Sequence, residues 1–248
     1  AGTATAYYLA KGGASVIVCE KGEIAGEQSS RNWGFVRQQG RDPAEIPLMM
    51  EANKIWRGLE RELNADLEWL AAGNMVTFAN AEEGAGWEAW RQTALEFGLD
   101  AKILTRAEAE AVVPGNAFDC HGAIFTESDG QAEPRKVTAA LARAAEGRGV
   151  EFLTNCAVFE VEMTGGKVSG VVTEQGVIRA PALQGLEHDG RDACHDEDDQ
   201  QNVERLSGGC VVPEDDLVRV GSRGALLPGR VEVRHGIVVG DSAVEVSS

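Results

Sequence analysis

The chain has 248 residues, a formal net charge of −17 and 43% hydrophobic residues, a composition typical of a soluble globular protein with one large or two modest domains. The acidity disfavours nucleic acid and anionic membrane surfaces as partners, and no apolar run is long enough to span a membrane. Five single cysteines without a CxxC pair indicate reduced thiols and neither a disulfide framework nor a zinc site. We therefore expect a cytoplasmic protein whose partner is a small molecule.

The first predicted elements are a helix and a buried strand. Small side chains between residues 2 and 11 precede the helix stop Gly12-Gly13, and SVIVCE is typical of a parallel strand ended by an acid. This is the second half of a βαβ unit, so we expect a strand and a GxGxx turn before Gly2. A dinucleotide pyrophosphate rests on the helix N-terminus of such a unit, and the acid, Glu20, binds ribose hydroxyls. The pattern alone leaves FAD, NAD and an ordinary α/β pair with a solvated Glu20 open.

The loop EIAGEQSSRNWGFVRQQG, residues 23–40, narrows these alternatives. Its backbone N–H donors and arginine suit a pyrophosphate, and its glycines permit close approach to a flavin face. Together with GTATAYYLAKGGASVIVCEKG and ESDGQAEPRKVTAALARAAEGRGVEFLTNCAVFEVE, the loop resembles the FAD-dependent amino-acid and amine oxidoreductases, the family of D-amino-acid dehydrogenases, glycine oxidase and monomeric sarcosine oxidase. An NAD site would not require a loop that approaches a flavin ring, so the loop favours FAD over NAD.

The resemblance implies FAD as cofactor and oxidation of the C–N bond of an amino acid or secondary amine by hydride transfer to the flavin. It implies that Arg37 grips the substrate carboxylate, for which a guanidinium fork is suited. The cofactor-binding residues that it implies are Gly2, Glu20, Lys21, Ser29, Ser30, Arg31, Asn32, Gly34 and Val158. A polar surface loop, a structural Arg37 and an ordinary strand residue at Val158 are the simpler alternatives.

The fold that the resemblance implies is α/β, with a Rossmann-type FAD-binding domain and an inserted α+β substrate domain. We expect the FAD-binding domain in residues 1–72 and 129–182 and part of the substrate domain in residues 73–128. Between them, the patterns predict helices at 43–63, 86–98 and 135–149, two short strands within 66–79, and a capping box at Thr105–Glu108. A strand at 122–128 and four short strands from 150 to 180 complete this part.

The resemblance fails after about residue 181, and residues 183–248 form an atypical acidic region. We expect no strand at the place where the family has one, and no aromatic residue occurs after Phe159. Three explanations stay open: a non-native reading frame or truncated gene product, a divergent β-rich end, or a metal site at His188, Cys194, His195 and the acids 196–199. Because this spacing fits neither zinc nor calcium, we expect no metal. The chain is then either a flavoenzyme, N-terminally truncated, or a non-catalytic remnant or subunit that a partner chain completes.

Overall fold

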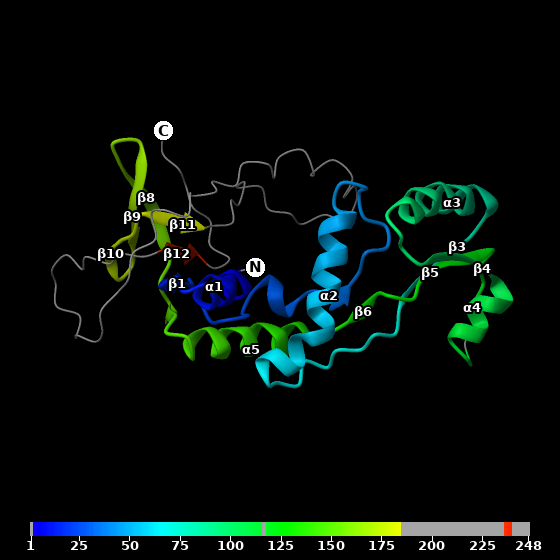
Figure 1. The fold of residues 1–248 in the computed structure, drawn as a ribbon, viewed down its shortest axis with the longest axis horizontal. Helices are drawn as coiled ribbons and strands as arrows, with labels where there is room; N and C mark the ends of the chain where they lie inside the picture. The colour runs from blue at the N-terminus through cyan, green and yellow to red at the C-terminus, as the bar shows by residue number, and fades with distance from the viewer. Residues whose placement is uncertain (1, 116–117, 185–235, 240–248) are drawn as a thin grey trace. The chain divides into compact units, whose positions relative to one another are not determined.

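A computed structural model describes residues 2–115, 118–184 and 236–239 (Figure 1). The chain divides into two compact units, one formed by residues 1–30 and 138–248 and the other by residues 31–137, and each is described by itself. The helices are α1 (Gly2–Lys11), α2 (Ile46–Leu63), α3 (Ala81–Glu96), α4 (Arg106–Val112) and α5 (Pro134–Glu146). The division into FAD-binding and substrate domains stays a prediction.

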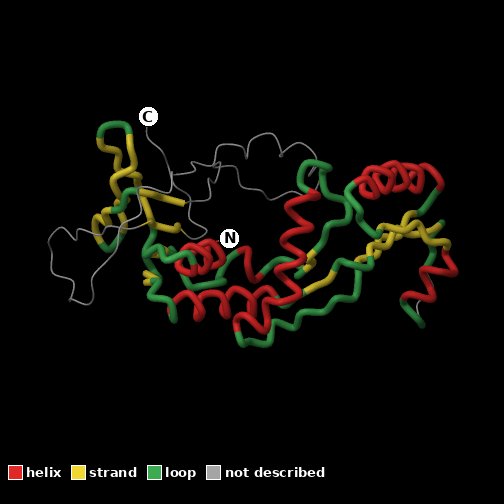
Figure 2. Tube along the Cα trace, in the orientation of Figure 1, coloured by secondary structure: helices red, strands yellow, loops and turns green. Residues whose placement is uncertain are grey.

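The first unit contains a four-stranded parallel sheet with the order β11-β12-β1-β7. Its strands are β1 (Val16–Cys19), β7 (Glu151–Leu153), β11 (Ala182–Gln184) and β12 (Gly236–Val239). All four residues of β1 are buried, as expected for a β-branched strand with neighbours on both sides. Helix α1 leads directly into β1 (Figures 1 and 2), and α1 and the part of α5 from Thr138 onward belong to the same unit as this sheet. The α/β class expected from the sequence is confirmed.

Helix α1 ends as its sequence predicts. Gly13 has a φ of 91°, and the backbone N–H of Ala14 donates to the carbonyl of Leu9 at 3.0 Å. This bond satisfies a carbonyl at the helix end that has no intrahelical partner, which fixes the direction in which the chain enters β1. Tyr7 is fully buried, so the helix is held to its unit by an aromatic side chain.

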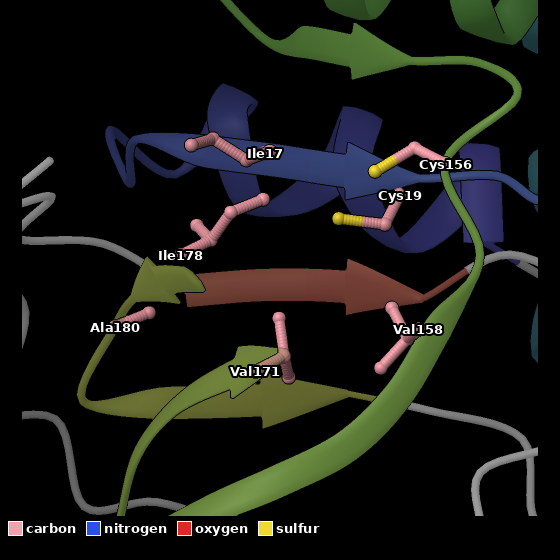
Figure 3. Packing of buried hydrophobic residues seen from close by; sticks show 7 residues of the cluster. All are labelled: Ile17, Cys19, Cys156, Val158, Val171, Ile178 and Ala180. Atoms are coloured by element: carbon pink, nitrogen blue, oxygen red, sulfur yellow. The ribbon is translucent and has the colours of Figure 1, made fainter. Parts of the chain in front are cut away.

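An antiparallel meander, β8 (Val158–Thr164), β9 (Lys167–Thr173) and β10 (Gly176–Arg179), completes the described part of the first unit. Gly165 and Gly166, both with positive φ, form the predicted turn between β8 and β9. One hydrophobic cluster contains residues of β1 and of the meander (Figure 3), namely Ile17, Cys19, Cys156, Val158, Val171, Ile178 and Ala180. The meander therefore shares a core with the strand that precedes Glu20.

The expectation that no strand follows residue 181 was wrong. Ala182–Gln184 forms β11, which pairs in parallel with β12 in the register Ala182↔Gly236. A strand of three residues is too short to show a hydrophobic periodicity, and its partner strand lies more than fifty positions away. The local sequence therefore could not predict it. Strand β12 falls in the region for which a divergent β-rich end was one of the three explanations left open. The other strands and the metal residues considered in this region lie outside the described residues.

The second unit contains an antiparallel sheet with the order β3-β5-β4 and a short ribbon of β2 and β6. Their bounds are Asn74–Phe78 for β3, Gly122–Thr126 for β5, Ala101–Thr105 for β4, Phe35–Val36 for β2 and Gly130–Gln131 for β6. The core of this unit joins α2, α3 and the sheet through Ile46, Ala94, Leu99, Ala101 and Ile124. Of the two strands predicted within 66–79, the second is found as β3, whereas the first was wrong, because Leu70 forms only an isolated bridge with Gln131.

Helix ends in the second unit follow local chemistry. Thr105 and Glu108 form the predicted capping box, in which the Thr105 hydroxyl accepts from the Glu108 N–H and Glu108 Oε2 accepts from the Thr105 N–H. Helix α2 has a proline in its first turn and ends at Asn64 in the left-handed conformation. No helix in the described parts of the chain combines the length and the apolar character needed to cross a bilayer.

Candidate cofactor and substrate site

A pocket lies at the N-terminal end of α1, next to the end of β1. Its walls come from α1, β1, the loop after β1, α5 and β7, all within the first unit. The lining residues are Gly2, Thr3, Val18, Glu20, Ile24, Ala25, Gly26, Glu27, Ser29, Thr138 and Phe152. Three of the predicted cofactor residues, Gly2, Glu20 and Ser29, therefore meet in one pocket.

The backbone on both sides of Glu20 is fixed. Its N–H donates to the carbonyl of Leu153 at 2.9 Å, and its carbonyl accepts from the N–H of Cys156 at 2.9 Å. The half-buried carboxylate accepts a bond from the N–H of Gly22 at 2.9 Å. These bonds hold an acid in the pocket wall where a parallel strand ends, the usual position for binding a ribose diol.

The N-terminus of α1 supplies the complementary part of the pocket. The first N–H groups of a helix have no intrahelical acceptor, and the macrodipole favours an anion there. The first turn of α1 carries no acidic residue, and Gly2 presents no side chain to the pocket. Backbone N–H donors at one side and an accepting carboxylate at the other form a set of groups that fits an adenosine diphosphate.

The two predicted serines differ in their surroundings. They lie on a 3₁₀ turn, Gln28–Ser30, at the far end of the loop that follows β1. Ser29 lines the pocket, whereas the Ser30 hydroxyl donates to the carbonyl of Glu27 at 2.9 Å. Ser29 therefore faces the pocket, and the Ser30 hydroxyl stabilises the turn.

Lys21 and Val158 are not among the residues that line the pocket. Lys21 is exposed and does not line the pocket, and the Val158 side chain is buried in the cluster of Figure 3. Thr138 and Phe152, which sequence reasoning missed, do line it. Phe152 is level with Val18 across the β1–β7 pairing, so the parallel register would have identified it once those strands were known to be neighbours.

The next predicted residues belong to the second unit and form a tight turn. The side-chain oxygen of Asn32 accepts from the N–H of Gly34 at 2.9 Å. Gly34 has a φ of 74°, and a Cβ atom there would lie 2.2 Å from the carbonyl oxygen of Ala132. Glycine is therefore required at this position. Arg31 and Trp33 are exposed, Trp33 by 87%.

Arg37 is half-buried and held by its own loop. Its Nη1 donates to the carbonyl of Gln39 at 2.8 Å. Gly40 has a φ of 69°, and a Cβ atom there would lie 3.2 Å from Arg37 Nη1 and 3.3 Å from the ring of Trp87. The guanidinium is thus confined by a backbone carbonyl and a closely approaching glycine, which limits its orientations.

Among the described residues, no group of three or more histidine, cysteine or acidic side chains is placed to hold a metal ion. Two cysteines, Cys19 and Cys156, lie side by side in the core of the first unit (Figure 3). Burial and, to a smaller extent, the neighbouring Cys156 raise the pKa of the Cys19 thiol to about 12. The Cys19 thiol is therefore unreactive at neutral pH.

Known proteins match most of the chain. A model of the DAO family, described as FAD dependent oxidoreductase, matches residues 1–184. Sarcosine oxidase subunit beta from Rhizobium meliloti is 30% identical over 73% of this chain and 45% of its own length. Among solved structures, L-amino acid deaminase from Proteus myxofaciens has a TM-score of 0.69 at 34% identity, covering 75% of this chain and 42% of that one. Glycine oxidase from Geobacillus kaustophilus has a TM-score of 0.67 at 25% identity, covering 73% and 51%. The chain spans about half the length of these relatives, or less.

Proposed function

Because the chain belongs to the family of FAD-dependent oxidoreductases, we propose that it forms the adenosine-binding part and the carboxylate-binding loop of an enzyme that oxidises C–N bonds. The observation that carries this proposal is the meeting of Gly2 and Glu20 in one pocket. A helix N-terminus and a strand-ending acid are the two elements that a dinucleotide needs, and their spacing along the chain matches that use.

In the proposed complex, N–H groups of the first turn of α1 bind the pyrophosphate and Glu20 accepts hydrogen bonds from the ribose hydroxyls. When bound, FAD would supply the hydride acceptor for an oxidation in which the C–N single bond of the substrate becomes C=N. Ser29, Ser30, Arg31, Asn32 and Gly34 are proposed to contact the pyrophosphate, the ribityl chain or the ring. The roles of Lys21 and of the Val158 backbone toward the adenosine stay predictions.

The proposed substrate is an amino acid or a secondary amine that carries a carboxylate. Sarcosine, glycine and L-amino acids, the compounds in the names of the relatives, share these two groups. Arg37 would bind the carboxylate, since a guanidinium forms two parallel hydrogen bonds to its oxygens. This fixes the orientation of the carbon that bears the nitrogen, and no protein nucleophile is required.

A partner subunit is part of the proposal. The relative from Rhizobium meliloti is named as subunit beta, and the present chain covers 45% of it. A second chain could therefore contribute residues to the same enzyme. The cytoplasmic location expected from the sequence stays a prediction.

The test is a titration of the purified full chain with FAD and, separately, with NAD. We expect FAD to bind and its fluorescence to change on binding, and NAD to have no effect. Addition of sarcosine, glycine or a panel of D- and L-amino acids without oxygen should then bleach the flavin absorbance. A chain that binds FAD but is not bleached would favour a subunit that needs a partner. A folded chain that binds no FAD would overturn the proposal in favour of a non-catalytic remnant or of a subunit whose flavin site a partner chain completes.

A further inference from the structure

A buried carboxylate in the second unit makes three hydrogen bonds to the loop that carries Arg37. The Asp129 side chain is fully buried, and its Oδ1 accepts from the backbone N–H of Gln38 at 2.8 Å and from Gln38 Nε2 at 2.9 Å. Its Oδ2 accepts from the backbone N–H of Gln39 at 3.1 Å. One carboxylate thus holds two consecutive peptide groups, with both of its oxygens engaged.

The same peptide groups hold Arg37. The carbonyl of Gln39, whose N–H is bound by Asp129, accepts the hydrogen bond from Arg37 Nη1. A displacement of the Gln39 backbone would therefore move the acceptor that orients the guanidinium. Asp129 and Arg37 are connected through one residue.

Asp129 itself is anchored to the sheet of the second unit. Its N–H donates to the carbonyl of Thr126 at 3.3 Å, and its carbonyl accepts from the N–H of Gly73 at 2.9 Å. The Thr126 hydroxyl also donates to Gln39 Oε1 at 2.9 Å. The end of strand β5 thus holds both Asp129 and the Gln39 side chain, so the loop is fixed to a rigid element.

We propose that Asp129 is a positioning residue for substrate recognition, which fixes the Gln38–Gln39 backbone and, through the Gln39 carbonyl, the Arg37 guanidinium. This inference rests on the proposed function of Arg37 as the group that binds the substrate carboxylate. A charged acceptor suits the role because charge-assisted hydrogen bonds are shorter and stronger than neutral ones. Sites that act on small molecules need such support to hold the contacting side chain in one orientation.

The test compares Asp129→Asn with Glu60→Gln in the full chain loaded with FAD. Glu60 is a matched control, since its carboxylate also accepts from two backbone N–H groups, those of Leu67 and Trp69. Acetate serves as the carboxylate probe and is followed by its effect on the flavin absorbance. Sarcosine, or whichever amino acid the wild type oxidises, serves for kinetics.

We expect Asp129→Asn to raise the Kd for acetate and the KM about tenfold, with a smaller change in kcat and an unchanged Kd for FAD. Amide exchange at Gln38 and Gln39 should become faster. Glu60→Gln should change none of these quantities. Arg37→Lys should weaken acetate binding, and adding Asp129→Asn to it should weaken binding by less than about twofold more, because both act through one group.

The inference is overturned if Asp129→Asn leaves acetate binding and KM unchanged, or if its effect adds fully to that of Arg37→Lys. In either case the proposed function stands as long as the wild type oxidises an amine. A wild type that binds FAD but neither acetate nor any amine would overturn the role of Arg37, and this inference with it. If Asp129→Asn does not fold, Thr126→Val makes the same test, since it removes the hydroxyl that holds the Gln39 side chain.

Discussion

The Glu20 carboxylate accepts a hydrogen bond from the backbone N–H of Gly22, with 2.9 Å between Oε1 and N. The bond closes a small turn at the end of β1 and holds the side chain in the wall of the pocket. Each carboxylate oxygen can accept more than one hydrogen bond, so the turn and a ribose diol can be bound together. Glu20 is therefore prearranged for its proposed ligand.

Glu20→Gln should weaken FAD binding by about tenfold to a hundredfold, because hydrogen bonds to a charged acceptor contribute about 1.5–3 kcal/mol. Isothermal titration of the full chain would measure the Kd. Glu23→Gln is the control, since this exposed acid lies in the same loop outside the pocket. An equal loss of FAD affinity in both variants would mean that net charge causes the loss and that Glu20 makes no specific contact.

Gly34→Ala should lower the free energy of unfolding by about 2–5 kcal/mol, because the residue needs a positive φ and its Cβ would meet the carbonyl of Ala132. Urea unfolding measures this change. Gly58→Ala is the matched control, because Gly58 lies within helix α2 and a Cβ atom there has open space. That variant should gain about 0.5–1 kcal/mol from helix propensity. A stable Gly34→Ala variant would mean that the turn at Asn32 can rearrange.

Cys19 should resist alkylation in the folded protein at pH 8. Burial and the adjacent Cys156 raise the pKa of its thiol to about 12, so its thiolate is scarce and shielded. A pulse of N-ethylmaleimide followed by peptide mass spectrometry should label the partly exposed Cys120 at least about a hundredfold faster. In urea the two rates should converge. Rapid labelling of Cys19 in native buffer would show that the core of the first unit opens readily.

Asp129 should make the free energy of unfolding depend on pH. Burial raises the pKa of its carboxyl above 3.8, although the hydrogen bonds from Gln38 and Gln39 oppose this, and the nearby Asp100 adds to it. The folded chain then binds this proton more tightly than the unfolded chain does. The contribution of Asp129 to stability is therefore fully present below pH 3.8 and falls as pH rises through the folded pKa.

Urea unfolding of the wild type and of Asp129→Asn across this pH range measures the effect as a difference. The difference in the free energy of unfolding between the wild type and the variant should become smaller as pH rises above 3.8. Other titrating groups cancel, because they are common to both proteins. A difference that grows with pH would mean that the three hydrogen bonds outweigh burial and lower the pKa.

Local chemistry made much of the fold predictable. The stop at Gly12-Gly13, the β-branched run before Glu20 and the Thr105–Glu108 capping box are each specified by neighbours in sequence, and each is found. Strand β11 was missed because its pairing depends on residues 236–239. A three-residue strand acquires its conformation from its partners and not from its own pattern.

Part of the pocket lining could also be predicted from the sequence. Spacing from a helix start to a strand-ending acid identified Gly2 and Glu20, which do share a pocket. Thr138 and Phe152 could not be found in this way, because they reach the pocket from α5 and β7 through tertiary packing. The buried pairing of Asp129 with Gln38 joins positions 91 residues apart, and nothing local to either indicates it.

Strand β1 lies between β7 and β12, so residues 16–19 must find residues 236–239 before the centre of this sheet is complete. Contacts between such distant parts of a chain form slowly, because the entropy of closing a long loop is lost before any pairing is gained. During synthesis, the open edge of β1 would emerge from the ribosome long before its neighbour. A nascent chain of this kind exposes an apolar strand edge and is a natural client for chaperones.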